Sequence, residues 1–102
     1  MKPQAKNRLV MTKGSIAARR ELGQEDHYSW VWVVPRQDGR FRVVAIEVPK
    51  GLVDNDECFF EDDMTKPYEK IVDRIEEIDD AVRDAGVDPE SLDAPWRSGF
   101  PL

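Results

Sequence analysis

Residues 28–48 read YSWVWVVPRQDGRFRVVAIEV, and this stretch decides the fold. Two runs of aromatic and β-branched residues, 28–34 and 41–48, are typical of β-strands. Asp38-Gly39 lies between them, and this dipeptide is the strongest short signal of a hairpin because a type I′ turn needs positive φ at both central positions. The stretch therefore predicts an antiparallel hairpin with a two-residue turn.

A two-residue turn at this place sets the register and makes the hairpin apolar on both faces. It places Trp32 opposite Ala45 and Val34 opposite Val43. An ordinary antiparallel meander is apolar on one face and polar on the other. Here one face is predicted to be aliphatic, with Val31, Val33, Val44, Ile46 and Val48. The other face is mostly aromatic, with Tyr28, Trp30, Trp32, Val34, Phe41 and Val43.

The residues outside the hairpin predict helices and one more strand. Ser15 caps a short N-terminal helix over residues 16–22. A long amphipathic helix runs from Thr65 to Gly86, because apolar side chains recur there at helical spacing. A third, shorter strand is expected over residues 57–60. The predicted fold class is α+β: a small antiparallel β-meander of two to three strands, packed on one long amphipathic helix, with a short N-terminal helix.

At 102 residues the chain is long enough for one core and too short for two. We expect a basic flexible arm over residues 1–14, a single α+β domain over residues 15–93 and a C-terminal tail over residues 94–102. The long helix has one apolar stripe and covers the aliphatic face. The aromatic face is covered by the short helix, by Trp96, Phe100 and Leu102 of the tail, or by a second copy.

The aromatic face favours a homodimer, because soluble monomers rarely expose a large apolar patch and because tryptophan and tyrosine are frequent at interface hot spots. Trp32 is expected near the centre of that interface. The residues predicted to take part in self-association are Tyr28, Trp30, Trp32 and Phe41.

Charge is distributed unevenly along the chain. The formal net charge is −6, yet residues 1–20 carry six basic side chains and no acidic one. Residues 54–102 carry five basic and 16 acidic side chains. A long helix would hold several of these acids four residues apart, where like charges repel. Such a stripe is either a solvated face or a surface kept for a basic partner.

We take the second interpretation as the leading hypothesis: a small acidic, non-enzymatic binding protein docks on a basic surface of a partner protein, one that binds nucleic acid. Nucleic-acid mimics, antitoxin-like inhibitors and viral anti-defence proteins act in this way. The residues predicted to bind the partner are Glu61, Asp62, Asp63, Glu69, Asp73, Glu76, Glu77, Asp80 and Asp84.

Two alternatives stay open. Direct nucleic-acid binding would use the basic residues Lys2, Lys6, Arg8, Lys13, Arg19 and Arg20, with Arg36, Arg40 and Arg42 beside the hairpin tryptophans. The net negative charge of the chain argues against it. A structural or oligomerising subunit would dock its basic arm on the acidic helix of the next copy.

Catalytic and metal motifs are not found in the sequence. Asp54-Asn55-Asp56 with Glu61 departs from a calcium loop, since the required glycine is missing. Nothing near Cys58 supports a dyad with His27, the single histidine. We therefore expect no enzyme activity, no cofactor and no metal. One cysteine and the lack of an apolar leader or membrane span favour the cytoplasm.

Overall fold

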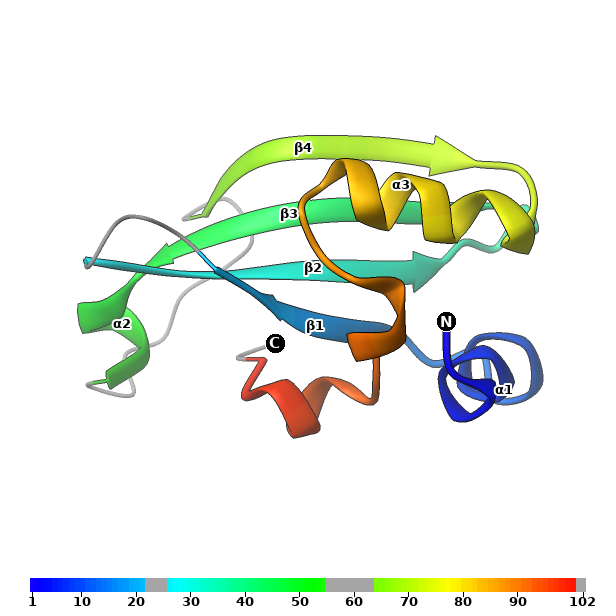
Figure 1. The fold of residues 1–102 in the computed structure, drawn as a ribbon, viewed down its shortest axis with the longest axis horizontal. Helices are drawn as coiled ribbons and strands as arrows, with labels where there is room; N and C mark the ends of the chain where they lie inside the picture. Colours follow the sequence, from blue (N-terminus) through cyan, green and yellow to red (C-terminus); the bar gives the residue numbers. More distant parts are fainter. Residues whose placement is uncertain (22–25, 55–63, 101–102) are drawn as a thin grey trace.

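The computed structural model describes residues 1–21, 26–54 and 64–100, and its centre is an antiparallel sheet of four strands in the order β1-β2-β3-β4 (Figure 1). The strands are β1 (Ile16–Arg20), β2 (His27–Pro35), β3 (Phe41–Pro49) and β4 (Thr65–Val72). The α-helices are α1 (Pro3–Met11), α2 (Lys50–Asp54) and α3 (Ile78–Asp84). Short 3-10 turns are η2 (Ile75–Glu77), η3 (Pro89–Ser91) and η4 (Pro95–Ser98). The predicted α+β class with an antiparallel meander is confirmed.

The β2–β3 hairpin forms as predicted, but its turn and register differ. The Arg36 amide donates to the Arg40 carbonyl at 2.8 Å, and the Gly39 amide donates to the Arg36 carbonyl at 3.3 Å. These two bonds close a loop of three residues, 37–39. Its last residue, Gly39, has a left-handed backbone with φ +85°. The extra loop residue shifts the pairing by one, and Trp32 lies opposite Val44 instead of Ala45.

This shift exchanges β3 side chains between the two faces, because successive residues of a strand point to opposite sides. Both faces are apolar, as the sequence predicts. The helical face is covered by α1 and α3 and contains Ile16, Ala18, Val31, Val33, Val43, Ala45 and Val72. The tail face contains Ala17, Trp30, Trp32, Val44, Ile46 and Val48.

Helix α1 occupies most of the segment that the sequence predicts as a flexible arm. Pro3 stands in its first turn, where the missing amide hydrogen costs nothing. Ala5 and Leu9 are four residues apart and share one helix face, on which both are buried against the sheet. The Lys2 ammonium donates to Asp93 at 3.0 Å. Burial of one face of α1 therefore orders the N-terminal residues.

The prediction of a long helix from Thr65 to Gly86 is wrong. Residues Thr65–Val72 form β4 on the open edge of β3, and the helix is shortened to Ile78–Asp84. A helix through the whole segment would hold Glu69 and Asp73 one turn apart as like charges. In β4 and the bend after it, each of these acids meets an arginine of the hairpin instead. Pro67 is tolerated because β4 is an edge strand.

The predicted helix over residues 16–22 is also wrong, since Ile16–Arg20 form β1 and pair with β2. Ile16, Ala17 and Ala18 are all buried, which suits a strand covered on both faces and does not suit an amphipathic helix. The strand predicted over residues 57–60 lies outside the described residues.

The helix exit predicted at Gly86 is confirmed. Gly86 has φ +96°, and its amide donates to the Arg83 carbonyl at 3.0 Å while the Val87 amide donates to the Val82 carbonyl at 3.2 Å. These two bonds form a Schellman motif, which satisfies carbonyls at the end of α3.

Replacing Gly39 tests the three-residue loop. We expect Gly39→Ala to lower the free energy of unfolding by about 1 kcal/mol, because a side chain strains a left-handed backbone. Gly39→Asn should lower it less, since asparagine tolerates this conformation. Urea unfolding of the two variants measures the difference. Equal losses in both would contradict the left-handed assignment.

Asp93 gives the stability a dependence on acid pH. The Ala94 amide and the Lys2 ammonium hydrogen bond to this carboxyl and lower its pKa below the ordinary value. A lowered pKa in the folded state contributes stability above the unfolded pKa of about 3.9, and this is lost as pH falls through the folded pKa. Urea unfolding between pH 6 and pH 3 should therefore show a smaller acid loss for Asp93→Asn than for the wild type. An equal loss of stability in the wild type and in Asp93→Asn would contradict the lowered pKa of Asp93.

Candidate functional site

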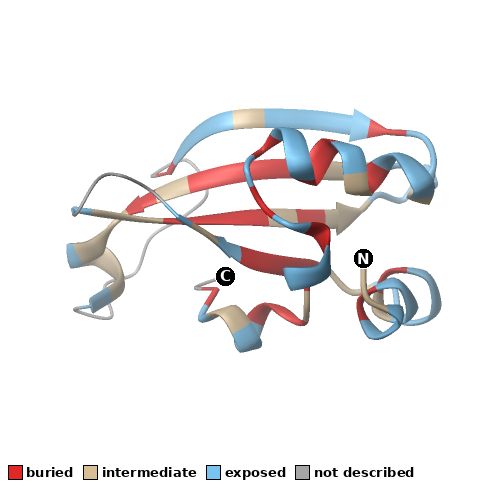
Figure 2. Cartoon of the chain, in the orientation of Figure 1, coloured by how far each residue is buried: buried red, intermediate tan, exposed pale blue. Residues whose placement is uncertain are grey.

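Four of the predicted acidic residues gather on the outer side of η2 and α3. Helix α3 buries Ile78, Ala81 and Val82 against the helical face, and its outer turns are exposed (Figure 2). We call the exposed set the α3 acidic face; it consists of Glu76, Glu77, Asp80 and Asp84. Within the described part of the chain, Asp80 is the one member with an ion pair, to Arg83 at 3.2 Å.

The other predicted acids do not join this face. The Arg42 Nε donates to Glu69 Oε2 at 2.6 Å, and Arg40 Nε lies 3.2 Å from Asp73 Oδ1. Glu61, Asp62 and Asp63 lie outside the described residues. The continuous stripe predicted along one helix is therefore replaced by a shorter acidic surface.

Of the four aromatic residues predicted to share one face, Tyr28, Trp30 and Trp32 do so, and only Phe41 does not. Trp30 is 1% exposed, and its ring meets Phe100 edge-on with centroids 5.9 Å apart. The Trp30 indole also donates to the Ser98 carbonyl at 2.9 Å, and Trp32 lies 5.1 Å from the Phe100 ring. The tail thus covers this face within the same chain, as one of the sequence alternatives has it. Phe41 belongs to the opposite, helical face.

Tyr28 lies at the far end of the tail face, in a polar setting. The Arg19 guanidinium lies 4.5 Å from its ring centroid and the Lys50 ammonium 5.2 Å from it. Its hydroxyl donates to Asp54 at 2.9 Å, which raises the pKa of the phenol. The ring is therefore used in cation–π contacts within the chain.

Most basic residues of the N-terminal segment have partners in the fold. Lys2 bonds Asp93, and Arg8 donates to the Ser15 carbonyl at 2.7 Å while its guanidinium lies 4.7 Å from the Trp96 ring. Arg20 donates to the Ala85 carbonyl at 2.8 Å. Lys6 borders a hollow beside Met1 and Asp79. These cations do not form one continuous track.

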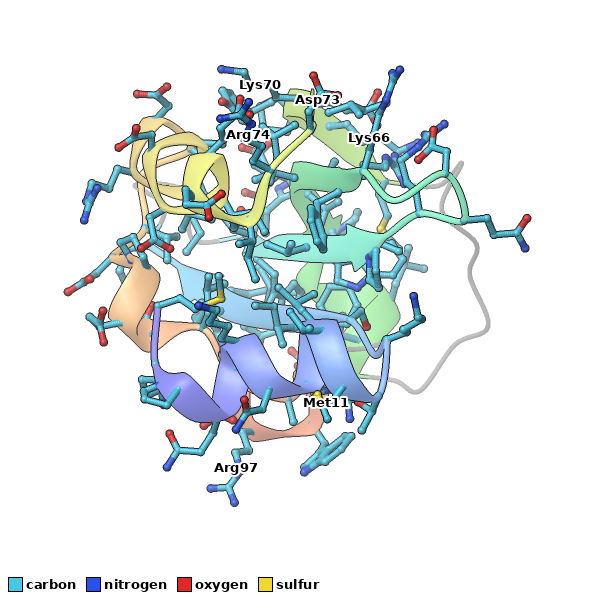
Figure 3. All side chains as sticks on the ribbon, turned by 90° about the vertical axis from the view of Figure 1, so that its right-hand side faces the viewer. Met11, Lys66, Lys70, Asp73, Arg74 and Arg97 are labelled. Atoms are coloured by element: carbon cyan, nitrogen blue, oxygen red, sulfur yellow. The ribbon has the colours of Figure 1, made fainter. Side chains whose placement is uncertain are left out.

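Lys13 is the exception, because the fold brings it to the arginines of the hairpin loop. Two adjoining hollows of about 140 and 370 Å³ lie between the end of α1 and this loop. Figure 3 faces this end of the molecule, with Met11 at the end of α1 below and Asp73 and Arg74 above. We call this depression the α1–hairpin groove; it is lined by Leu9, Val10, Lys13, Pro35, Arg36, Gly39, Arg40 and Phe41.

The sequence does not predict this groove, because its pattern favours a flexible arm for Lys13 and a separate hairpin for the arginines. The signal for α1 was present: Pro3 stands before Ala5 and Leu9, which are one helical turn apart. No local signal shows that α1 ends beside the hairpin loop, since the packing of Leu9 on the sheet decides that position.

The described ranges contain no cluster of side chains suited to a metal ion. Residues 1–21, 26–54 and 64–100 contain no group of three His, Cys, Asp or Glu side chains that could hold a metal ion. His27 Nδ1 lies 3.0 Å from Asp26 Oδ1 at the surface, and Cys58 lies outside the described residues. Among the helices described, none is long and apolar enough to cross a membrane.

Comparison with known proteins adds no relative: no family model, curated protein or solved structure matches the chain. Any function must therefore be inferred from the surfaces described above.

Removing the Phe100 ring tests whether the tail covers the tryptophans. Phe100→Ala should lower the free energy of unfolding by about 3 kcal/mol or more, because Phe100 is 8% exposed and packs on both indoles. Trp96→Ala is the matched control, four residues earlier in the tail; Trp96 is 68% exposed, so the loss should stay near 1 kcal/mol or below. Urea unfolding followed by tryptophan fluorescence measures both. A harmless Phe100→Ala would show that the tail does not cover the sheet.

Proposed function

We propose that this protein is a non-enzymatic binding protein that docks its α3 acidic face on a basic surface of a partner protein, one that otherwise binds nucleic acid. The carrying observation is the anchoring of α3. Ile78 and Val82 are fully buried and Ala81 is 1% exposed, so the outward direction of the acids is fixed by the core.

The acids are not needed to hold α3 in place. All four are exposed, and the single pair between Asp80 and Arg83 is exposed on both sides, where an ion pair contributes little to stability. Asp84 stands in the last turn of α3, where the helix dipole disfavours a negative charge. Asp80 and Asp84 are also like charges one turn apart. These unfavourable charge positions are offset within the fold by no more than the exposed pair of Asp80 with Arg83, as far as the described residues go, and this favours a role in binding.

Direct nucleic-acid binding by the N-terminal basic residues is the weaker candidate. Lys2, Arg8 and Arg20 are engaged with Asp93, the Ser15 carbonyl and the Ala85 carbonyl. Tracking of phosphates needs cations that face solvent together. The net charge of −6 further opposes it.

Neutralising two acids on α3 tests the proposal. Partner capture uses nuclease-treated lysate, and association rates are then measured on the purified partner. Asp80→Asn/Asp84→Asn should slow association by roughly tenfold in low salt, because opposite charges steer the encounter, and the difference should fade at about 0.5 M salt. The variant should unfold at the same or slightly higher urea concentration, since one like-charge pair is relieved.

Glu21→Gln/Asp26→Asn is the control for net charge, because it removes two exposed negative charges that do not belong to the α3 acidic face. It should leave association almost unchanged. If both double variants slow association equally, the slowing comes from the net charge and not from the α3 acidic face. A parallel capture uses lysate without nuclease, and recovery of nucleic acid there in place of a protein partner would support the weaker candidate.

A further inference from the structure

We propose that the α1–hairpin groove is a second binding site, which takes an acidic peptide segment of a partner protein with one large apolar side chain between its carboxylates. The site lies apart from the α3 acidic face and has the opposite charge. Its occupant follows from two properties of the lining: an apolar floor and a basic rim.

The floor leaves apolar surface open to solvent. Leu9 is fully packed beneath it, whereas Val10 is 49% exposed and Pro35 and Phe41 are half-buried. A hollow of about 140 Å³ with this lining suits a single side chain. Covering exposed apolar surface is the general driving force for seating such a side chain.

The rim carries three cations, Lys13, Arg36 and Arg40. The two arginines make only exposed ion pairs within the fold. Arg36 lies 3.5 Å from Asp38, and Arg40 lies 3.2 Å from Asp73, but all four side chains are at least 42% exposed. Lys13 has no ion pair in the described ranges. Carboxylates of a ligand therefore replace weak surface pairs and do not break a buried network.

The backbone at Lys13 ends α1 in a left-handed turn, in which the Gly14 amide donates to the Arg8 carbonyl at 3.0 Å. Lys13 has φ +54°, and it is the one described non-glycine residue with positive φ. Glycine adopts this conformation without strain, whereas lysine does so at a cost. A left-handed lysine on the rim gives the groove its unpaired charge at the expense of local stability.

A peptide fits these features better than a nucleic acid. Asp38 lies in the hairpin loop and Asp73 lies 3.2 Å from Arg40, so a nucleic-acid strand, with a charge at every phosphate, meets two carboxylates near the rim. The apolar lining contains one aromatic ring, Phe41, while stacking of successive bases needs several aromatic platforms. A side chain flanked by two or three carboxylates matches both floor and rim.

The probe for the test is a fluorescein-labelled peptide with the core Asp-Glu-Phe-Glu-Asp. Two control peptides carry Ser in place of Phe, or Asn and Gln in place of the acids. Fluorescence anisotropy at 50 mM salt should show at least fivefold tighter binding of the probe than of either control, since each control removes one of the two recognised features.

Variants of the rim separate the groove from general charge effects. Lys13→Gly should weaken probe binding by about threefold or more while its urea midpoint stays equal or rises, because the charge and the backbone strain leave together. Arg36→Gln should also weaken binding. Arg97→Gln is the matched control: its guanidinium is 68% exposed on η4, so probe binding should be unchanged.

Each of the other outcomes overturns the proposal. These are no binding of the probe at millimolar concentration, equal binding of the control peptides, and equal binding by Lys13→Gly and the wild type. Tighter binding of a single-stranded oligonucleotide than of the probe at the same salt would assign the groove to nucleic acid. Dissociation of a dimer by Lys13→Gly in sedimentation would assign it to a second copy.

Discussion

The structure depends on one constraint: the β2–β3 hairpin is apolar on both faces, and each face has to be removed from water. Neither a helix nor a turn alone covers both sides of a sheet. The chain therefore places α1 and α3 over one face and the tail over the other. Val33 on the helical face and Trp30 on the tail face are both buried as a result. Segments at the two ends of the sequence thus complete the two core clusters on either side of the sheet.

The same arrangement decides where charge is left at the surface. Because β4 joins the edge of β3, Glu69 and Asp73 pair with arginines of the hairpin, and the acidic surface contracts to the outer side of α3. Because α1 packs on the sheet beside the hairpin loop, Lys13 comes next to Arg36 across a depression with an apolar floor. The molecule thus presents an acidic face and a basic groove, each held by buried neighbours and each with exposed charges.

Local features of the fold were predictable from the sequence, and non-local ones were not. The strands around Asp38-Gly39 and the helix exit at Gly86 are confirmed, because turn chemistry acts over a few residues. The register was missed by one residue, since Asp38-Gly39 fits both a two-residue turn and a loop with glycine at its third position. Of the candidate site, the acids of α3 were predicted; the meeting of Lys13 with the hairpin loop was not.

The sequence by itself determined that two apolar faces would need cover and that acidic residues would concentrate in the second half of the chain. Both follow from side-chain chemistry and from the alternation of a strand. Only the tertiary structure decided that Thr65–Val72 is a strand and that the tail covers the aromatic side of the hairpin, where Phe100 packs on Trp30. The reason is that the open edge of β3 and the exposed indole exist only after the hairpin has formed, and they then select the conformation of segments whose own preferences are weak.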